Sequence, residues 1–138
     1  MEINIDFDGT CTTHAFPAIG KDIGAVPILK KSVSSGHRLI LFTMRSNKKG
    51  TSLVTNKTEF GGLSDAVKWF EDNDIPLCGI QTNPTQSSWT ESPKSYAPLM
   101  IDDSALGCPL KTDFSISDRP FVDWSKVEDL LISKELIQ

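Results

Sequence analysis

The sequence predicts an α/β domain built on a mostly parallel β-sheet that is covered on both faces. Short apolar segments with strand character alternate along the chain with segments whose apolar residues recur at helical spacing. One of these segments, residues 39–42, is an unbroken apolar run, which is typical of a strand buried on both faces. With 138 residues and no internal repeat, residues 1–138 are expected to form a single domain with its own core.

In the first half of the chain, residues 1–5 open with apolar side chains and predict a strand. Residues 11–23 contain several turn formers and predict an irregular excursion. Residues 24–35 carry apolar side chains at approximate helical spacing, and Gly36 directly after them is a typical helix terminator. The unbroken apolar run at residues 39–42 predicts the second strand.

In the second half, residues 44–62 are polar, contain glycine and lack periodicity, so they predict a long loop. Residues 63–72 place their apolar side chains on one face and predict a helix. Two further strands are predicted at residues 77–81 and 97–101, and a last helix is predicted over residues 124–137.

Composition and charge exclude several kinds of partner. The net charge is −4 and no basic run is present, which argues against binding to a nucleic-acid backbone. The chain shows neither a signal peptide nor a run of about 20 apolar residues, so no membrane association is expected. The three cysteines are widely spaced without a Cys-x-x-Cys pair, which disfavours a zinc site and favours a cytoplasmic location.

Carboxylates stand at the points where two predicted strands end. Asp6 and Asp8 follow the first strand, and an extended chain would point both to the same side. Asp102 and Asp103 follow the last strand, and Thr43 ends the second. Ligand sites of parallel sheets lie at the carboxyl ends of the strands, so these side chains are expected to meet. A simple Asp-Gly turn is the alternative explanation of the first pair, but neighbouring carboxylates repel each other unless a cation or a proton intervenes.

The motif DFDGT at residues 6–10, followed in order by Thr43, Lys94 and the pair at residues 102–103, resembles the haloacid dehalogenase (HAD) superfamily. Most members of that superfamily are magnesium-dependent phosphatases. The resemblance covers nearly the whole chain and extends to small bacterial and phage HAD proteins with a similar opening. It implies a Rossmann-like three-layer sandwich, and the short connections leave no room for a large cap domain. In the superfamily, a site without a cap goes with macromolecular or bulky substrates, or with oligomers in which a neighbouring subunit covers the site. The resemblance is therefore compatible with a homo-oligomer.

The resemblance also implies roles for individual residues. Asp6 would attack phosphorus and form an aspartyl phosphate, and Asp8 would act as general acid and then as base. The ligands of Mg²⁺ would be the Asp6 carboxylate, the Asp8 backbone carbonyl and a carboxylate of Asp102 or Asp103, a choice that the sequence leaves open. Thr43 and Lys94 would bind the oxygens of the phosphoryl group of a phosphorylated substrate. Without the resemblance, Thr43 could simply end a strand and Lys94 could be a solvated surface lysine.

The sequence leaves the roles of several residues, and the function itself, open to more than one interpretation. Arg45 is expected either to contact a substrate anion or to be a solvated loop arginine. His14 is expected to be exposed without a role. Asn83 and Gln86 are suggested as substrate contacts by their location alone. Besides a phosphohydrolase acting on a phosphate monoester, the motifs are compatible with a noncatalytic module that binds a phosphorylated ligand. They are also compatible with a phosphotransferase or mutase.

Overall fold

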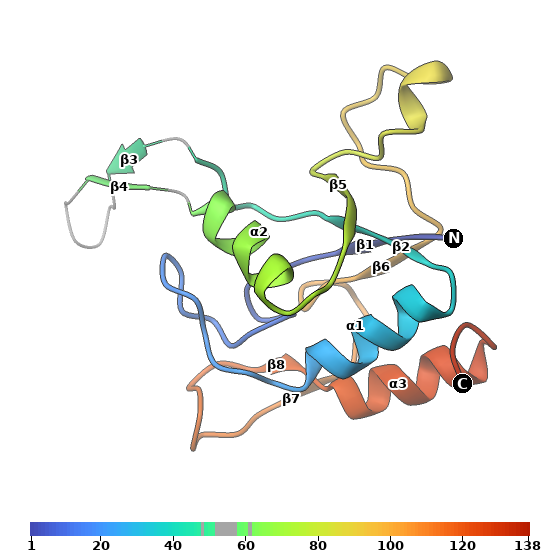
Figure 1. Ribbon diagram of the computed structural model, residues 1–138. Helices are drawn as coiled ribbons and strands as arrows, with labels where there is room; N and C mark the ends of the chain where they lie inside the picture. The colour runs from blue at the N-terminus through green and yellow to red at the C-terminus, as the bar shows by residue number, and fades with distance from the viewer. Residues whose placement is uncertain (48, 52–57, 61) are drawn as a thin grey trace.

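A parallel four-stranded sheet forms the centre of the protein, as a computed structural model shows (Figure 1). The structure describes residues 1–47, 49–51, 58–60 and 62–138. Every neighbouring pair of strands in the sheet is parallel, which confirms the predicted α/β class and makes the fold Rossmann-like. The strands lie in the order β5 (Leu77–Ile80), β2 (Arg38–Leu41), β1 (Glu2–Ile5) and β6 (Leu99–Ile101).

The order of the strands reverses between β1 and β6. The chain adds β2 and then β5 on one side of β1, and it places β6 on the other side. Ile5 lies beside Ile101 in the register of this pair, and the backbone N–H of Asp6 donates to the carbonyl of Ile101 at 3.0 Å. Residues that directly follow β1 and β6 therefore emerge next to each other at the crevice where α/β sheets bind ligands.

The helices share one hydrophobic core. They are α1 (Ala25–Ser34), α2 (Leu63–Asp72) and α3 (Trp124–Ser133). Their buried side chains form one cluster with the same face of β1 and β2, to which Ile3, Ile5, Leu39 and Leu41 belong. Burial of these apolar side chains is the main force that holds the helices on the sheet.

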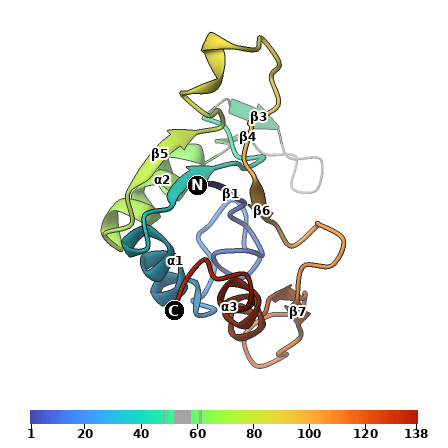
Figure 2. The same ribbon diagram turned by 90° about the vertical axis from the view of Figure 1, so that its right-hand side faces the viewer.

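The opposite face of the sheet is covered by a loop segment, residues 82–98. It contains only the short 3₁₀ helix η1 (Gln86–Ser88), and Figure 2 shows it above the sheet, with α1 and α3 below. Asn4, buried in β1, donates from Nδ2 to the carbonyl of Ser95 at 3.0 Å and accepts from Ser95 Oγ at 3.0 Å. One outer layer of the predicted sandwich thus consists of helices, and the other consists of this segment.

The last helix is shorter than predicted. It begins after Asp123, whose side chain accepts a hydrogen bond from the Lys126 backbone at 3.2 Å, and it ends at Ser133 rather than at residue 137. Glu135 adopts a positive φ of 59°, which turns the chain out of the helix. Ile137 is still buried, so the apolar pattern continues into the core beyond the helix and made the helix look longer.

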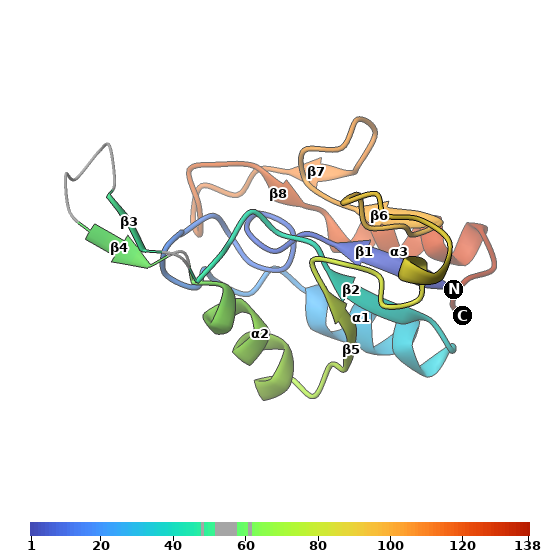
Figure 3. The same cartoon turned by 90° about the horizontal axis from the view of Figure 1, so that it is seen from above.

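Two short antiparallel pairs of strands lie outside the elements that the sequence predicts. Strands β3 (Lys49–Thr51) and β4 (Thr58–Phe60) pair antiparallel within the predicted loop, of which residues 48, 52–57 and 61 lie outside the described chain. Figure 3 shows this pair projecting from the end of the sheet at which β1 and β2 end. Strands β7 (Leu110–Lys111) and β8 (Phe121–Val122) form the second pair. Within the described ranges, no helix is long and apolar enough to cross a membrane.

Candidate metal centre

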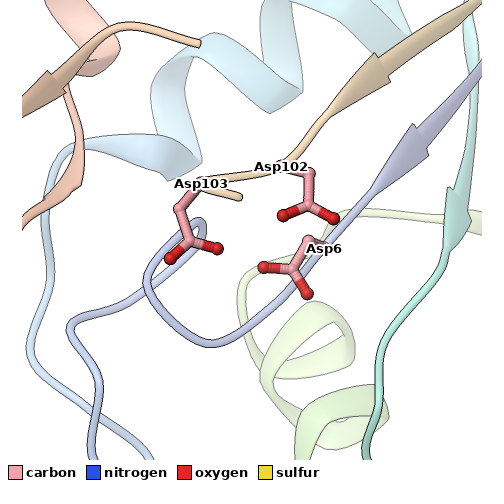
Figure 4. Close-up of side chains that lie close together, drawn as sticks. All are labelled: Asp6, Asp102 and Asp103. Carbon is pink, nitrogen blue, oxygen red and sulfur yellow. The ribbon is translucent and has the colours of Figure 1, made fainter. Parts of the chain in front are cut away.

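Three carboxylates meet at the carboxyl ends of β1 and β6 (Figure 4). Asp6 follows β1, and Asp102 and Asp103 follow β6. One oxygen of each carboxylate lies within 4.8 Å of the others. The structure therefore brings together residues that are about a hundred positions apart in the chain, as expected for the ends of adjacent parallel strands.

Thr10 ties the two strand ends to each other. Its hydroxyl donates to Asp6 Oδ2 at 2.7 Å and accepts from the backbone N–H of Asp103 at 3.0 Å. The Thr10 side chain is fully buried, and Trp124 Nε1 donates to its carbonyl at 2.7 Å, which holds the turn against α3. Thr10 thus orients the Asp6 carboxylate by bonding to its Oδ2 oxygen.

The electrostatic environment of Asp6 disfavours its negative charge. Burial raises the pKa of Asp6 to about 7, the charge of nearby Asp102 acts in the same direction, and the hydrogen bond from Thr10 opposes both. A cation among the carboxylates would remove this penalty. Three carboxylates offer only hard oxygen donors, the ligands that Mg²⁺ and Ca²⁺ prefer, so the residues present fit such an ion.

Asp102 and Asp103 differ in their partners. Asp102 Oδ1 accepts from both the backbone N–H and the hydroxyl of Ser104, each at 2.8 Å. Asp102 Oδ2 has no hydrogen-bond partner in the described part of the chain, and Figure 4 shows this carboxylate facing Asp6. Asp103 Oδ2 lies 2.9 Å from His14 Nε2, and its other oxygen lies 3.4 Å from the Thr10 hydroxyl. Asp102 is therefore the freer ligand of the two.

His14 was expected to be an exposed residue without a role, and the expected exposure is wrong. Its side chain is only 15% exposed and pairs with Asp103. His14 and Asp103 can lie so close to residue 9 because that residue is glycine, with φ of 79°. A Cβ at Gly9 would lie 2.0 Å from His14 Nε2 and 2.6 Å from Asp103 Oδ2. The Asp-Gly signal in the sequence thus marks a close contact at the site as well as a turn.

Asp8 does not belong to the cluster of Asp6, Asp102 and Asp103, and it pairs with Arg45 instead. Arg45 Nε donates to Asp8 Oδ2 at 2.8 Å, and Arg45 Nη2 donates to Asp8 Oδ1 at 2.7 Å. Arg45 is 2% exposed, so the alternative of a solvated loop arginine is wrong. Its remaining N–H groups donate to backbone carbonyls of residues 17, 18 and 62. A direct contact between Arg45 and a substrate would require some of these bonds to break.

Gln81 holds the segment after β2, which carries Thr43 and Arg45. Gln81 Oε1 accepts from the Thr43 backbone N–H at 2.9 Å, and Gln81 Nε2 donates to the carbonyls of Thr43 at 2.6 Å and Arg45 at 3.0 Å. The half-buried Thr43 accepts through its hydroxyl from the Arg45 backbone N–H at 3.1 Å. Gln81 has a positive φ of 66°, a conformation that no pattern in the sequence reveals.

Lys94 lies apart from the carboxylates. It is exposed in the segment that covers the opposite face of the sheet, and its carbonyl accepts from Gln86 Nε2 at 2.9 Å. In the described part of the chain, no ion pair joins its ammonium group to Asp6 or Asp8. Asn83 and Gln86, suggested as substrate contacts by location, are buried and bind backbone groups of their own segment. Their amides are thus used in folding that segment.

Fold and site together define a Rossmann-like α/β protein with an acidic cluster at its topological switch point. The chain matches no protein-family model and no curated protein sequence. Among solved structures, it is similar to a conserved protein from Bacteroides thetaiotaomicron, with 27% sequence identity and a TM-score of 0.71. The similarity covers 97% of this chain and 91% of that chain, so the two share the whole fold.

Proposed function

We propose that this protein is a magnesium-dependent phosphohydrolase that acts on a phosphate monoester through an aspartyl-phosphate intermediate. The observation that carries the proposal is the cluster of Asp6, Asp102 and Asp103 at the switch point of the sheet. The order of motifs that resembles the HAD superfamily supports it. Free thiols at all three cysteines agree with a reducing cytoplasm as the place of this reaction.

The metal would be held mainly by Asp6 and Asp102. One Asp102 carboxylate oxygen has no hydrogen-bond partner among the residues that the structure describes, and the Asp8 backbone carbonyl would add a third oxygen. Asp103, bonded to His14 and Thr10, would support the site by its charge and by fixing the turn. When bound, Mg²⁺ neutralises the charge of the phosphoryl group.

The chemistry would begin at Asp6 Oδ1. While Thr10 holds Oδ2, Oδ1 forms a bond to phosphorus, and the ester P–O bond breaks with both electrons leaving on the alcohol oxygen. Asp8 supplies the proton that the leaving oxygen needs. In the second step Asp8 accepts a proton from water, the water oxygen bonds to phosphorus, and the P–O bond to Asp6 breaks. The products are the alcohol and inorganic phosphate, and both carboxyl groups return to their first state.

Thr43 and Lys94 would bind the transferring phosphoryl oxygens in this scheme. The Thr43 hydroxyl accepts one hydrogen bond and still has its own hydrogen to donate. Lys94 is exposed in the segment of residues 82–98, and for this role its ammonium group would have to come within hydrogen-bond distance of the phosphoryl group at Asp6.

The test is hydrolysis of 4-nitrophenyl phosphate by the parent protein, by Asp6→Asn and by Asp129→Asn, with Mg²⁺ or with EDTA. Asp129 lies exposed on α3 and is the matched control for loss of one carboxylate. We expect turnover that requires Mg²⁺, is lost in Asp6→Asn and is retained in Asp129→Asn. Mass spectrometry of acid-quenched protein should find one phosphoryl group on the peptide that contains Asp6. Equal activity of Asp6→Asn and the parent would refute the proposal.

One observation favours a second candidate, a module that binds a phosphorylated ligand without turning it over. Both oxygens of Asp8 are engaged by Arg45, so the carboxylate that should move protons is already paired. Calorimetry with Mg²⁺ and tungstate, a phosphate mimic, separates the two candidates when combined with the activity assay. Binding together with no hydrolysis of any of several phosphate esters would identify the binding module.

A further inference from the structure

Every N–H group of the Arg45 side chain donates a hydrogen bond to another part of the protein. A guanidinium group has five N–H hydrogens. Two of them reach the Asp8 carboxylate at 2.8 and 2.7 Å, and three reach the carbonyls of Pro17, Ala18 and Gly62 at 3.1, 2.7 and 3.4 Å. The group also lies 5.1 Å from the ring centroids of both Phe7 and Phe16. These hydrogen bonds and ring contacts together hold the Arg45 side chain in one position.

The two parallel hydrogen bonds from the Arg45 guanidinium group fix the orientation of the Asp8 carboxylate. A carboxylate that accepts one hydrogen bond at each oxygen from a planar guanidinium group cannot rotate about its last torsion without breaking a bond. The Asp8 side chain remains 19% exposed on its other side, whereas the Arg45 side chain is 1% exposed. Asp8 is therefore held rigidly by a buried partner and presents its open side to solvent.

Arg45 also connects Asp8 to the end of β2. Its backbone N–H donates to the Thr43 hydroxyl, and its carbonyl accepts from Gln81. Its side chain holds residues 17 and 18 of the segment that follows the first motif, and that segment carries His14, the partner of Asp103. The geometry of Asp8 consequently depends on one residue that is bonded to three parts of the site.

We infer that Arg45 is a positioning residue that aligns Asp8 with the leaving oxygen of the substrate. This inference rests on the proposed function, in which Asp8 transfers the proton. Arg45 itself does not touch the substrate, because none of its N–H groups is free. The rival explanation is that Arg45 only stabilises the fold, in which case its loss would reduce the hydrolysis of every ester by the same factor.

Two aryl esters of similar size distinguish these explanations. Phenyl phosphate releases a basic phenolate that needs a proton, whereas 4-nitrophenyl phosphate releases a stable anion that needs little help. We expect Arg45→Lys, which keeps the charge but loses the two parallel hydrogen bonds, to lower kcat/KM for phenyl phosphate at least about tenfold more than for 4-nitrophenyl phosphate, because kcat/KM reports the step that releases the phenolate. Asp8→Asn should show the same selective loss.

A double-variant cycle supplies a second readout. If Arg45 acts through Asp8, Arg45→Lys combined with Asp8→Asn should add no further selective loss to that of Asp8→Asn alone. Arg38→Lys is the matched control, because Arg38 pairs with Glu2 at 2.6 Å at the other end of β2. It should leave the ratio of the two kcat/KM values at that of the parent.

Chemical rescue covers the case in which the lysine variant packs poorly. Millimolar guanidinium chloride added to Arg45→Ala should restore hydrolysis of phenyl phosphate more than hydrolysis of 4-nitrophenyl phosphate, and sodium chloride should not. Equal losses for both esters in Arg45→Lys, or additive losses in the double variant, would overturn the inference and leave the proposed function standing. Failure of the parent to exceed Asp6→Asn with either ester would instead refute the proposed function, and the inference with it.

Discussion

His14 Nε2 lies 2.9 Å from Asp103 Oδ2 across 89 positions of the sequence. Asp103 belongs to the acidic cluster, and Asp8, two residues after Asp6, pairs in turn with Arg45. Residues 14–18 contribute to both, through the His14 ring and through the carbonyls of residues 17 and 18. The segment after the first motif is thus fastened to the site at two points.

Removal of the His14 ring should weaken metal binding. Partners that orient metal ligands typically contribute about 10- to 100-fold to affinity, so His14→Ala is expected to lower Mg²⁺ affinity by that order. Isothermal titration with Mg²⁺ measures the change. His37→Ala is the control, because His37 bonds the Leu136 carbonyl at 2.7 Å, far from the cluster in sequence and fold. Equal affinities of the two variants would contradict a supporting role for His14.

The hydroxyl of Thr10 should matter for both stability and the site. Thr10→Val keeps the shape but leaves the Asp103 N–H without its acceptor, which should lower the free energy of unfolding by about 1–3 kcal/mol. It should also reduce Mg²⁺-dependent turnover, because Asp6 Oδ2 loses its donor. Urea unfolding and the ester assay measure the two effects. Thr12→Val removes another buried hydroxyl, which donates only to the Thr13 carbonyl, and should reduce stability alone.

Replacement of Gly9 should be costlier than replacement of another glycine with the same backbone conformation. Gly9 and Gly107 have φ of 79° and 89°, so alanine at either position carries a backbone strain of about 1–2 kcal/mol. A Cβ at residue 107 meets nothing within 4 Å, whereas a Cβ at residue 9 collides with His14 and Asp103. Urea unfolding should therefore show a larger loss for Gly9→Ala than for Gly107→Ala. Equal losses would mean that the contact around Gly9 opens without cost.

The charge of Asp6 should destabilise the protein in EDTA as the pH rises. Its pKa is raised from 3.8 to about 7, so between these values the folded state holds a proton that the unfolded state has released. Stability from this group is therefore greatest at low pH and falls as the pH rises towards about 7. Asp6→Asn cannot ionise, so its stability relative to the parent should increase from about pH 5 to about pH 8, on the order of 2–3 kcal/mol. Thermal unfolding in EDTA measures the difference, and a pH-independent difference would contradict the expectation.

Addition of Mg²⁺ to these samples should reverse the effect. A bound cation favours the ionised Asp6 carboxylate, so Mg²⁺ should raise the melting temperature of the parent more at about pH 8 than at about pH 5. Asp6→Asn should respond much less at either pH. If the melting temperature of the parent does not change when Mg²⁺ is added, the cluster does not bind the ion.

Much of the fold could be predicted because it rests on short-range pattern. Short apolar segments identified the four parallel strands, and helical spacing identified α1 and α2 within about a residue of their ends. The end of α3 was missed because Ile137 is buried without being helical. The pairs β3–β4 and β7–β8 were missed because strands of two or three residues are too short to show alternation.

The sequence by itself determined that Asp6, Asp102 and Asp103 would meet, because residues that end adjacent parallel strands emerge at the same edge. Only the tertiary structure decided the partners of these groups. Arg45 and His14 lie in segments without periodicity, 37 and 89 positions from the carboxylates that they bind. Such contacts depend on how a loop folds back over the sheet, and a loop's path is set by hydrogen bonds such as those of Gln81, which no apolar pattern encodes.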